Sequence, residues 1–365
     1  MAILARPDDI VVGLDVHKDT IAAGILRPGT ETPDVERLFH DEASVRRFVA
    51  RLQDPTRLRA CYEAGPTGYE LARLLASLGV RCEVIAPSLI PKAPGDKVKT
   101  DRRDCRRLAR LYRVGELVAI RIPTREEEAV RDLCRSRWAM VVDYTRARHR
   151  LTKFLLRHGR VWRGGVNWTS RHLAWLDSQR FDDEALALTY GHYRAAVTTR
   201  RVALEAVEAD LATYVTKPPF AEAVARLGAY RGISEIVALG VAAEVCDWRR
   251  FPTARSFMGF MGLVPSEYSS GSSVHRGRLT KAGNAHLRRQ LIEAAWAYRH
   301  RPHVGKVMAA RHRGLDPAVV ARAWRAQCRM CGRFRRLGAR KDSQSIVAAA
   351  IARELAGFLW AEMNA

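Results

Sequence analysis

The chain is short of acidic residues: 39 Asp and Glu stand against 62 Lys and Arg in 365 residues, a formal net charge of +23 at pH 7. It also lacks long apolar segments, since no uninterrupted apolar run approaches the roughly 20 residues that span a bilayer. The N-terminal stretch MAILARPDDIVVGLDVHKDT has no apolar segment after a basic start, unlike a secretory signal peptide. We therefore expect neither a membrane protein nor a secreted one.

Cysteine is scarce as well. The seven cysteines are scattered and odd in number, which argues against a disulfide framework and suits a reducing cytosol. Cys328 and Cys331 form a single C-x-x-C, but no second pair lies nearby, and a zinc site needs about four ligands. We expect helix-buried cysteines there rather than a metal site.

The excess of positive charge comes mostly from Arg, whose planar fork matches phosphate oxygens and guanine edges. Hydrophobic residues make up 47% of the chain, enough to form folded cores. A folded, strongly basic protein indicates a large polyanionic partner, and we expect that partner to be nucleic acid. The alternative is a soluble basic protein without such a partner. We expect a cytoplasmic, nucleoid-associated location.

Residues 1–122 predict an α/β domain. DIVVGLDV and TIAAGIL are short apolar runs separated by a polar turn, which is typical of a hairpin. RACYEA and RCEVIAP are two further strand candidates. The stretches GPTGYELARLLASLGV and KTDRRDCRRLARLYRVG have helical spacing of their apolar residues.

Residues 123–217 predict two long helices with an irregular insert between them. Thr124 and Glu127 form a capping box at the start of the first helix. Apolar and aromatic residues then recur at the spacing of a coiled coil, with Arg137 and Arg200 as interruptions. The seam could pair within one chain or between chains. The insert is basic and rich in Trp, which could stack on bases or pack against the helices.

Residues 218–365 predict a mostly helical, very basic domain. AYRGISEIVALGVAAEV resembles one half of a helix-hairpin-helix, in which backbone amides at a helix N-terminus meet phosphate. Such hairpins usually carry Gly-x-Gly, and Ser234 replaces the second glycine here.

Four carboxylates in the first region fall where strands end and a helix begins. Asp15 and Glu63 end strand candidates, while Asp101 and Asp104 are three residues apart at the start of a helix and share one face. Such residues can meet at one edge of a sheet and bind Mg²⁺, which prefers oxygen ligands shared with phosphates. Taken singly, each has an ordinary alternative as a helix N-terminal acid, a turn former or a surface strand end.

The stretch EYSSGSSVHRGRLTKAG in the third region has two interpretations. Ser/Gly runs are usually flexible linkers. A serine among basic residues can instead attack a phosphate that those residues hold. The acidic set favours the second interpretation, because a metal site for phosphate needs a nucleophile.

These residues also carry a resemblance. GLDVHKD, YEAGPTGYEL and KTDRRDCRRLA resemble the three blocks of the DEDD transposases of the insertion-sequence 110 family. FMGLVPSEYSSGSSVHRGRLTKAGNAHLRRQLIEAAW resembles the C-terminal transposase block of that family. The resemblance spans nearly the whole chain. Cys105 departs from it, since alanine is frequent at that position.

The resemblance implies an RNase-H-like fold of the Holliday-junction-resolvase type for the first region. Asp15, Glu63, Asp101 and Asp104 match the positions that bind Mg²⁺, with Mn²⁺ as an alternative. The family's catalytic serine precedes a glycine shortly after GL-x-P, and Ser270 matches it. The neighbouring serines are alternatives if the register shifts: Ser269, Ser272 and Ser273.

The resemblance further implies a site-specific recombinase that joins donor and target DNA. Its members are guided by a structured non-coding RNA, and the acidic domain of one protomer meets the serine domain of another. We therefore expect a homo-oligomer, a dimer or a tetramer. Six basic residues after the serine are expected to contact nucleic acid: His275, Arg276, Arg278, Lys281, Arg288 and Arg289.

The mechanism expected from these residues is attack of Ser270 on a DNA phosphate, giving a covalent 5′-phosphoserine, with metal at the acidic set. The main alternative is a metal-only nuclease or junction resolvase in which the serine loop merely binds phosphate. A second alternative is a nucleic-acid-binding assembly protein whose catalytic residues are idle.

Overall fold

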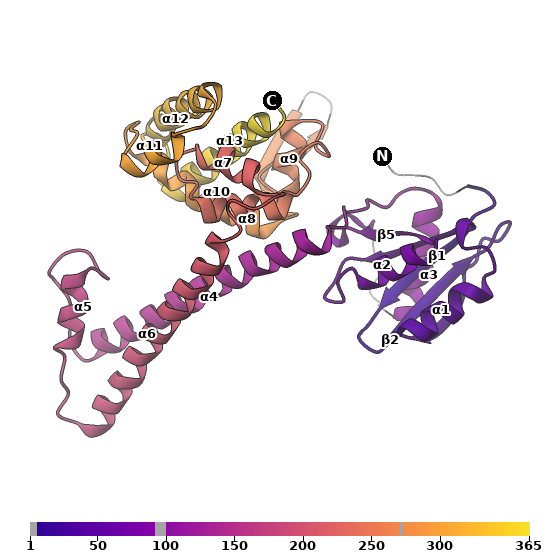
Figure 1. Cartoon of the computed structure of the whole chain (residues 1–365), viewed down its shortest axis with the longest axis horizontal. Helices are drawn as coiled ribbons and strands as arrows, with labels where there is room; N and C mark the ends of the chain where they lie inside the picture. Colours follow the sequence, from indigo (N-terminus) through magenta and orange to yellow (C-terminus); the bar gives the residue numbers. More distant parts are fainter. Residues whose placement is uncertain (1–5, 92–99, 271–272) are drawn as a thin grey trace. The chain divides into compact units, whose positions relative to one another are not determined.

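The computed structural model describes residues 6–91, 100–270 and 273–365. The chain divides into two compact units, Met1–Pro123 and Thr124–Ala365 (Figure 1). The expected separation of residues 123–217 from residues 218–365 stays a prediction, because residues 124–365 together make up the second unit. No helix among the described residues is long and apolar enough to cross a membrane.

The first unit is built on a five-stranded mixed sheet in the order β3-β2-β1-β4-β5. β1, β2 and β3 form an antiparallel meander, whereas β4 and β5 run parallel to β1. The strands are β1 Ile10–Val16, β2 Thr20–Leu26, β3 Asp34–Phe39, β4 Leu58–Glu63 and β5 Arg81–Ile85. This mixed α/β architecture is consistent with the RNase-H-like fold expected from the sequence.

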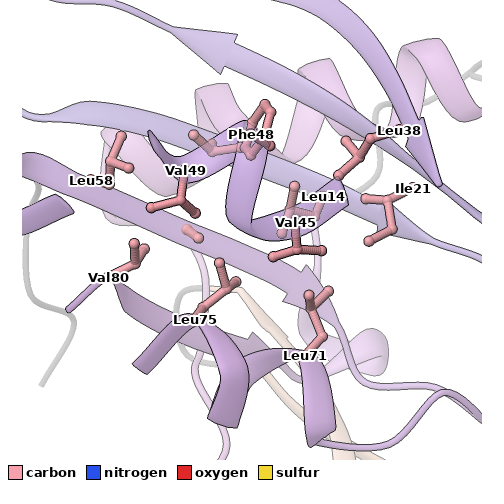
Figure 2. A pocket seen from close by; sticks show the side chains of 12 residues that line it. Leu14, Ile21, Leu38, Val45, Phe48, Val49, Leu58, Leu71, Leu75 and Val80 are labelled. Carbon is pink, nitrogen blue, oxygen red and sulfur yellow. The ribbon is translucent and has the colours of Figure 1, made fainter. Parts of the chain in front are cut away.

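Helices cover both faces of the sheet. α1 (Glu42–Arg51) and α2 (Glu70–Ser77) lie on one face, and α3 (Asp101–Arg113) lies on the other. Because side chains alternate along a strand, Leu14 of β1 packs with Val45 and Leu75 of the two helices (Figure 2), whereas Val11 packs with residues of α3. Two short 3-10 turns, Pro55–Arg57 and Pro87–Leu89, precede β4 and follow β5.

The α3 side of the sheet has no side chains at one point, where Gly13 of β1 pairs with Gly24 of β2. A Cβ atom on Gly13 would lie 2.4 Å from both the Ala109 nitrogen and the Cys105 oxygen. One on Gly24 would lie 2.7 Å from the same Cys105 oxygen. The backbone of α3 therefore rests directly on the backbone of β1 and β2, which no larger residue would allow.

The predicted hairpin, the two further strands and the helices now called α2 and α3 are confirmed. β3 and α1 are not among the elements predicted from the sequence. β3 is an edge strand whose side chains are partly or fully exposed, so it has no continuous apolar run. α1 is capped by Asp41, whose carboxylate accepts a hydrogen bond of 2.7 Å from the Ser44 backbone nitrogen.

The second unit begins with α4 (Arg125–Arg157), which packs against α6 (Glu184–Ala212) (Figure 1). The predicted capping box is confirmed: the Thr124 nitrogen donates to Glu127 Oε2 at 2.8 Å, and the Glu127 nitrogen donates to Thr124 Oγ1 at 3.1 Å. Leu151 and Phe154 of α4 and Val197 of α6 belong to one apolar cluster. The two helices thus pair within one chain, while supercoiling and pairing between chains stay predictions.

The insert between these helices contains a short helix, α5 (Ser170–Asp177). His172 of α5 is buried, and three tryptophan rings surround it. The ring centroids of Trp162, Trp168 and Trp175 lie 5.5, 5.2 and 5.6 Å from that of His172. This arrangement favours packing over base stacking as the role of the tryptophans.

The remainder of the second unit is mostly helical, as the sequence predicts, and shares one apolar core. Its helices are α7 Ala221–Gly228, α8 Glu235–Val245, α9 Ala254–Phe260, α10 Ala285–Ala295, α11 Lys306–His312, α12 Pro317–Gly338 and α13 Gln344–Met363, with a 3-10 turn at Trp296–Arg299. Ser234 caps α8 by accepting a hydrogen bond of 3.3 Å from the Val237 nitrogen. Cys331 of α12 is buried, whereas Cys328 is exposed.

One element of the second unit is absent from the sequence prediction. β6 (Pro265–Ser270) and β7 (Ser273–Leu279) form a two-stranded antiparallel sheet. The described side chains of β7 are almost all exposed, so the pair lacks the apolar alternation by which strands are recognised in a sequence. Below, these two strands are called the serine ribbon.

The close approach of α3 makes a prediction. Gly13→Ala should lower the free energy of unfolding of the first unit by about 1–3 kcal/mol, because the added methyl overlaps the α3 backbone. Urea unfolding monitored by circular dichroism measures the change. Gly65→Ala is the matched control, since its Cβ would have only the Glu63 oxygen nearby, at 3.8 Å. Equal stabilities of the two variants would contradict the tight contact.

Candidate active site

The carboxyl ends of two parallel strands meet at one edge of the first unit's sheet. β1 and β4 are neighbours, and Leu14 is in register with Tyr62. Asp15 and Glu63 are the next residues along each strand. Val11 and Cys61 pack on the α3 side, so the alternation of side chains places Asp15 and Glu63 on that side as well.

The first turn of α3 brings two more carboxylates to this edge. Thr100 caps the helix, accepting a hydrogen bond of 3.3 Å from the Arg103 nitrogen. Asp101 lies one turn before Cys105, and Asp104 one turn before Leu108. Cys105 and Leu108 are buried, so the two acids lie on the sheet-facing side of α3.

A histidine that the sequence prediction does not include joins the acids. The Nε2 atom of His17 lies 3.4 Å from Asp15 Oδ2 and 3.4 Å from Asp101 Oδ1. One ligand atom from each of these three residues lies within 4.8 Å of the other two, a grouping able to hold a metal ion. His17 follows Asp15 by two residues, but it is a single histidine in the turn after β1, so no residue pattern in the sequence marks it.

The structure thus unites Asp15 and Asp101 closely, with Asp104 beside them. Burial raises the pKa of Asp15 above its usual value; His17 lowers it, while the charges of Asp101 and Asp104 raise it further. Glu63 is exposed on the adjacent strand end and is not part of the close group of three. The exposed position leaves its side chain free to turn toward a ligand.

Asp104 provides the test of whether a cation fits this group. Its Oδ1 atom lies 3.5 Å from an Arg107 nitrogen. Its Oδ2 atom is shielded from solvent and accepts no hydrogen bond from the described residues. A shielded carboxylate oxygen without a partner is costly, and a metal ion would satisfy it. The donor set of carboxylate oxygens and one imidazole nitrogen therefore fits a divalent cation.

The predicted nucleophile, Ser270, is exposed at the end of β6 in the serine ribbon. It pairs with Ser273 of β7, so these two residues lie on the same face of the ribbon. Tyr268 and His275 form another pair on that face, and Tyr268 is 79% exposed. Gly271 and Ser272 lie outside the described residues, as does the side chain of Ser269.

The six predicted nucleic-acid contacts fall into two groups. His275, Arg276 and Arg278 are exposed on β7, and Lys281 follows the strand in a left-handed conformation with φ of 54°. His275 lies on the same face of the ribbon as Ser270, whereas Arg276 does not. Arg276 pairs across the ribbon with Glu267, and its Nε atom lies 3.7 Å from Glu267 Oε2.

The other group, on α10, is engaged within the protein. Arg288 donates a hydrogen bond of 2.7 Å to the Met261 carbonyl oxygen, and burial lowers its pKa. The guanidinium of Arg289 lies 5.0 Å from the centre of the Trp138 ring. Both side chains are therefore partly used for packing.

The helix that follows the serine ribbon, α10, is anchored at its start by the buried carboxylate of Glu244. Asn284, which caps α10, donates a hydrogen bond of 2.7 Å to Glu244 of α8. Arg135 of α4 donates to both oxygens of the same carboxylate, at 2.7 and 2.9 Å. Burial raises the pKa of Glu244, but the hydrogen bonds from Arg135 and Asn284 outweigh it and leave the pKa below its usual value. The sequence gives no sign of this contact, because its partners are far apart along the chain.

A mixed sheet with carboxylates at its edge, in a strongly basic chain, suits an enzyme that acts on nucleic acid, and comparison with known proteins gives the class. Residues 12–159 match a family of DEDD transposases, and residues 224–310 match the transposase IS116/IS110/IS902 family. The two matches cover the acidic set and the serine ribbon. Because this family acts on DNA, the substrate of the chain is DNA.

Individual relatives agree. The chain is 42% identical over 354 residues to the putative transposase y4qE of Sinorhizobium fredii, covering 96% of this chain and 87% of the relative. It is 34% identical over 333 residues to the transposase for insertion sequence element IS1533 of Leptospira borgpetersenii, covering 90% and 96%. The chain belongs to the IS110 family of transposases, as its resemblance to the insertion-sequence 110 family predicts.

The raised pKa of Asp15 leads to a prediction of how the stability of the protein depends on pH. A carboxyl whose pKa is raised by folding contributes stability that is complete below its unfolded pKa and is lost as pH rises through the folded pKa. Asp15→Asn removes that loss, so it should raise the melting temperature of the protein in EDTA at pH 7 by roughly 2–4 °C. The difference should shrink as pH falls toward 4.

Differential scanning calorimetry of the full chain measures this change. Asp19→Asn, at an exposed acid outside the group, is the control and should shift the melting temperature by less than about 1 °C. If Asp15→Asn melts at a lower temperature than the wild type at pH 7 in EDTA, the ionised Asp15 carboxylate does not destabilise the folded protein, and the prediction is wrong.

Proposed function

We propose that this transposase is a recombinase that cuts and rejoins DNA strands through a covalent bond to Ser270. The observation that carries the proposal is the placement of Ser270, exposed at the end of β6 in a polar ribbon that leads into α10, whose cap Asn284 is bound by the buried Glu244. A linker would need no such anchoring. The exposed hydroxyl can approach a phosphate that is itself part of a bulky duplex.

In the proposed step, Ser270 Oγ forms a bond to phosphorus and the bond from phosphorus to the 3′ oxygen breaks. The hydroxyl proton leaves the serine, and the departing oxygen becomes a 3′ hydroxyl. The products are a 5′-phosphoserine and a free 3′ end. Attack by a different 3′ hydroxyl reverses the step and joins a new pair of strands, so no external energy source is needed.

The carboxylates of Asp15, Glu63, Asp101 and Asp104, here called the acidic group, are proposed to hold Mg²⁺, with Mn²⁺ as the alternative. Asp15, Asp101 and Asp104 would be its ligands, with Glu63 turning in from the adjacent strand and His17 beside them. When bound, such an ion polarises the phosphate and stabilises charge on the oxygens of the displacement. The shielded Oδ2 atom of Asp104 supports this assignment.

The basic residues of the serine ribbon are proposed to bind the reacting phosphate. His275 shares the face of Ser270 and is expected to lie nearest to the developing charge. Arg276, Arg278 and Lys281 would hold the adjoining backbone. Arg288 and Arg289 are proposed to contact it further away, with the donors that packing leaves available.

Two further parts of the proposal rest on family membership and charge. The acidic group of one protomer would act with Ser270 of another, which makes the active enzyme a dimer or tetramer. A structured RNA from the element would select donor and target by base pairing. The net charge of +23 suits a protein that holds two polyanions by their backbones.

The alternative function is a metal-only junction resolvase or nuclease. The acidic group would then activate water, and the serine ribbon would only bind phosphate. The observation in favour of this alternative is that Asp15, His17 and Asp101 form a group able to hold a metal ion without any residue of the serine ribbon. The two functions differ in one product, because only the first gives a covalent protein–DNA adduct.

Covalent trapping tests the proposal. The wild type, incubated with Mg²⁺, guide RNA and labelled donor DNA, should give a slower band on a denaturing gel, and Ser270→Ala should give none while binding DNA with nearly unchanged affinity. Ser273→Ala is the matched control, because it removes the exposed hydroxyl opposite Ser270 on the same ribbon face. The control should retain the adduct.

An adduct that persists in Ser270→Ala would remove this serine from the role. Cleavage by the wild type without any adduct would instead support the metal-only resolvase.

A further inference from the structure

One face of α4 carries a row of basic side chains in its second half. Arg146, Arg150, Lys153 and Arg157 recur at intervals of four, three and four residues, which places them on a single face of the helix. All four are exposed. We call these four residues the α4 basic row.

The basic row faces away from the helix pair. The buried residues of this half of α4, among them Leu151, Phe154 and Leu155, pack into the cluster shared with α5 and α6. At 100° per residue, the row lies about 120° around the helix from those residues. The row therefore takes no part in the core, and folding of the helix pair does not require its charges.

The charges of the row are not balanced by acids. Residues 144–176 contain eight Lys and Arg and no Asp or Glu. Arg146 has a carboxylate neighbour, Asp143 at 3.5 Å, but both side chains are exposed and such a pair is weak. Arg150, Lys153 and Arg157 form no ion pair with the described residues. The carboxylate of Asp177, which ends the stretch, is bound by Arg194 at 2.8 Å.

Like charges spaced four residues apart on a helix repel each other. The pairs Arg146 with Arg150 and Lys153 with Arg157 have this spacing, so the row costs the free protein stability. A feature that folding neither uses nor neutralises indicates a partner of opposite charge. The exposed Arg163 and Arg171 of the insert extend the same uncompensated charge beyond the end of α4.

The dimensions of the row match a phosphate backbone. Eleven residues separate Arg146 from Arg157, a rise of about 16 Å along the helix. One strand of duplex DNA presents a phosphate about every 3.4 Å along its axis, so the row spans about five phosphates. The tryptophans of the insert, packed around His172, are not arranged as a stacking platform for unpaired bases.

We propose that the α4 basic row, with Arg163 and Arg171, is a binding site for the sugar-phosphate backbone of duplex DNA, without sequence recognition. The site shares no residue with the acidic group or with the serine ribbon. It adds affinity for DNA without being part of the site that binds the reacting phosphate. The proposal rests on the family's DNA substrate and does not depend on the phosphoserine mechanism.

A triple variant of the full chain tests the site: Arg150→Gln, Lys153→Gln and Arg157→Gln. Fluorescence anisotropy with a duplex of unrelated sequence, measured from 50 to 200 mM NaCl, gives the slope of log K against log salt. Loss of three phosphate contacts should reduce that slope by about 2.7 and weaken binding at least about tenfold at 100 mM salt. The melting temperature should stay equal or rise, because repulsion within the row is relieved.

A matched control removes three charges from another helix: Arg46→Gln, Arg47→Gln and Arg51→Gln on α1. These arginines are exposed, and Arg46 and Arg51 already pair with acids, Glu42 and Glu36. The control should change the slope by less than about 1. Equal slopes for the two triple variants would overturn the site.

Two further measurements keep the result interpretable. If the triple variant unfolds, Lys153→Gln alone should still reduce the slope by about 1, and an unchanged slope would overturn the proposal. Binding of a structured RNA should be weakened less than binding of duplex DNA. A loss confined to the RNA would overturn the assignment to DNA.

Discussion

The contact between α3 and the sheet is the constraint on which the acidic group depends. Gly13 and Gly24 leave the β1–β2 surface without side chains, and the α3 backbone occupies that space. The helix start is thereby held over the end of β1. Without this approach, Asp101 would be an ordinary N-terminal acid of a surface helix, stabilised by the helix dipole and by little else. With it, Asp101 lies beside His17 and Asp15.

Negative and positive charge gather on different elements of the protein. Negative charge is gathered at one sheet edge, where the folded state raises the pKa of Asp15 and leaves an Asp104 oxygen without a hydrogen bond from the described residues. Positive charge is spread over the serine ribbon and one face of α4. A protein built for stability alone would have neither feature, because both cost free energy until a ligand of opposite charge arrives. The first feature suits a cation and the second suits a polyanion.

The sequence predicts those elements whose apolar residues repeat strongly, namely the β1–β2 hairpin, β4, β5, α3 and the two long helices. It fails for β3 and for the serine ribbon, because these strands are largely exposed and have no buried face to leave a pattern. For the acidic group, Asp15, Asp101 and Asp104 follow from their places at element ends. His17 is missed because a single histidine in a turn carries no pattern, and the Glu244–Asn284 bond is missed because it joins residues forty positions apart.

The central claim is that the acidic group at the end of β1 binds a divalent cation, and metal titration tests it without relying on turnover. Loss of the free Mn²⁺ signal in electron paramagnetic resonance measures binding to the full chain in the absence of nucleic acid. The account predicts that Asp104→Asn weakens Mn²⁺ binding at least about tenfold, since it alters a shielded oxygen that accepts no hydrogen bond from the described residues, while Asp19→Asn leaves binding unchanged. Equal Mn²⁺ affinity of the wild type and Asp104→Asn would contradict the account.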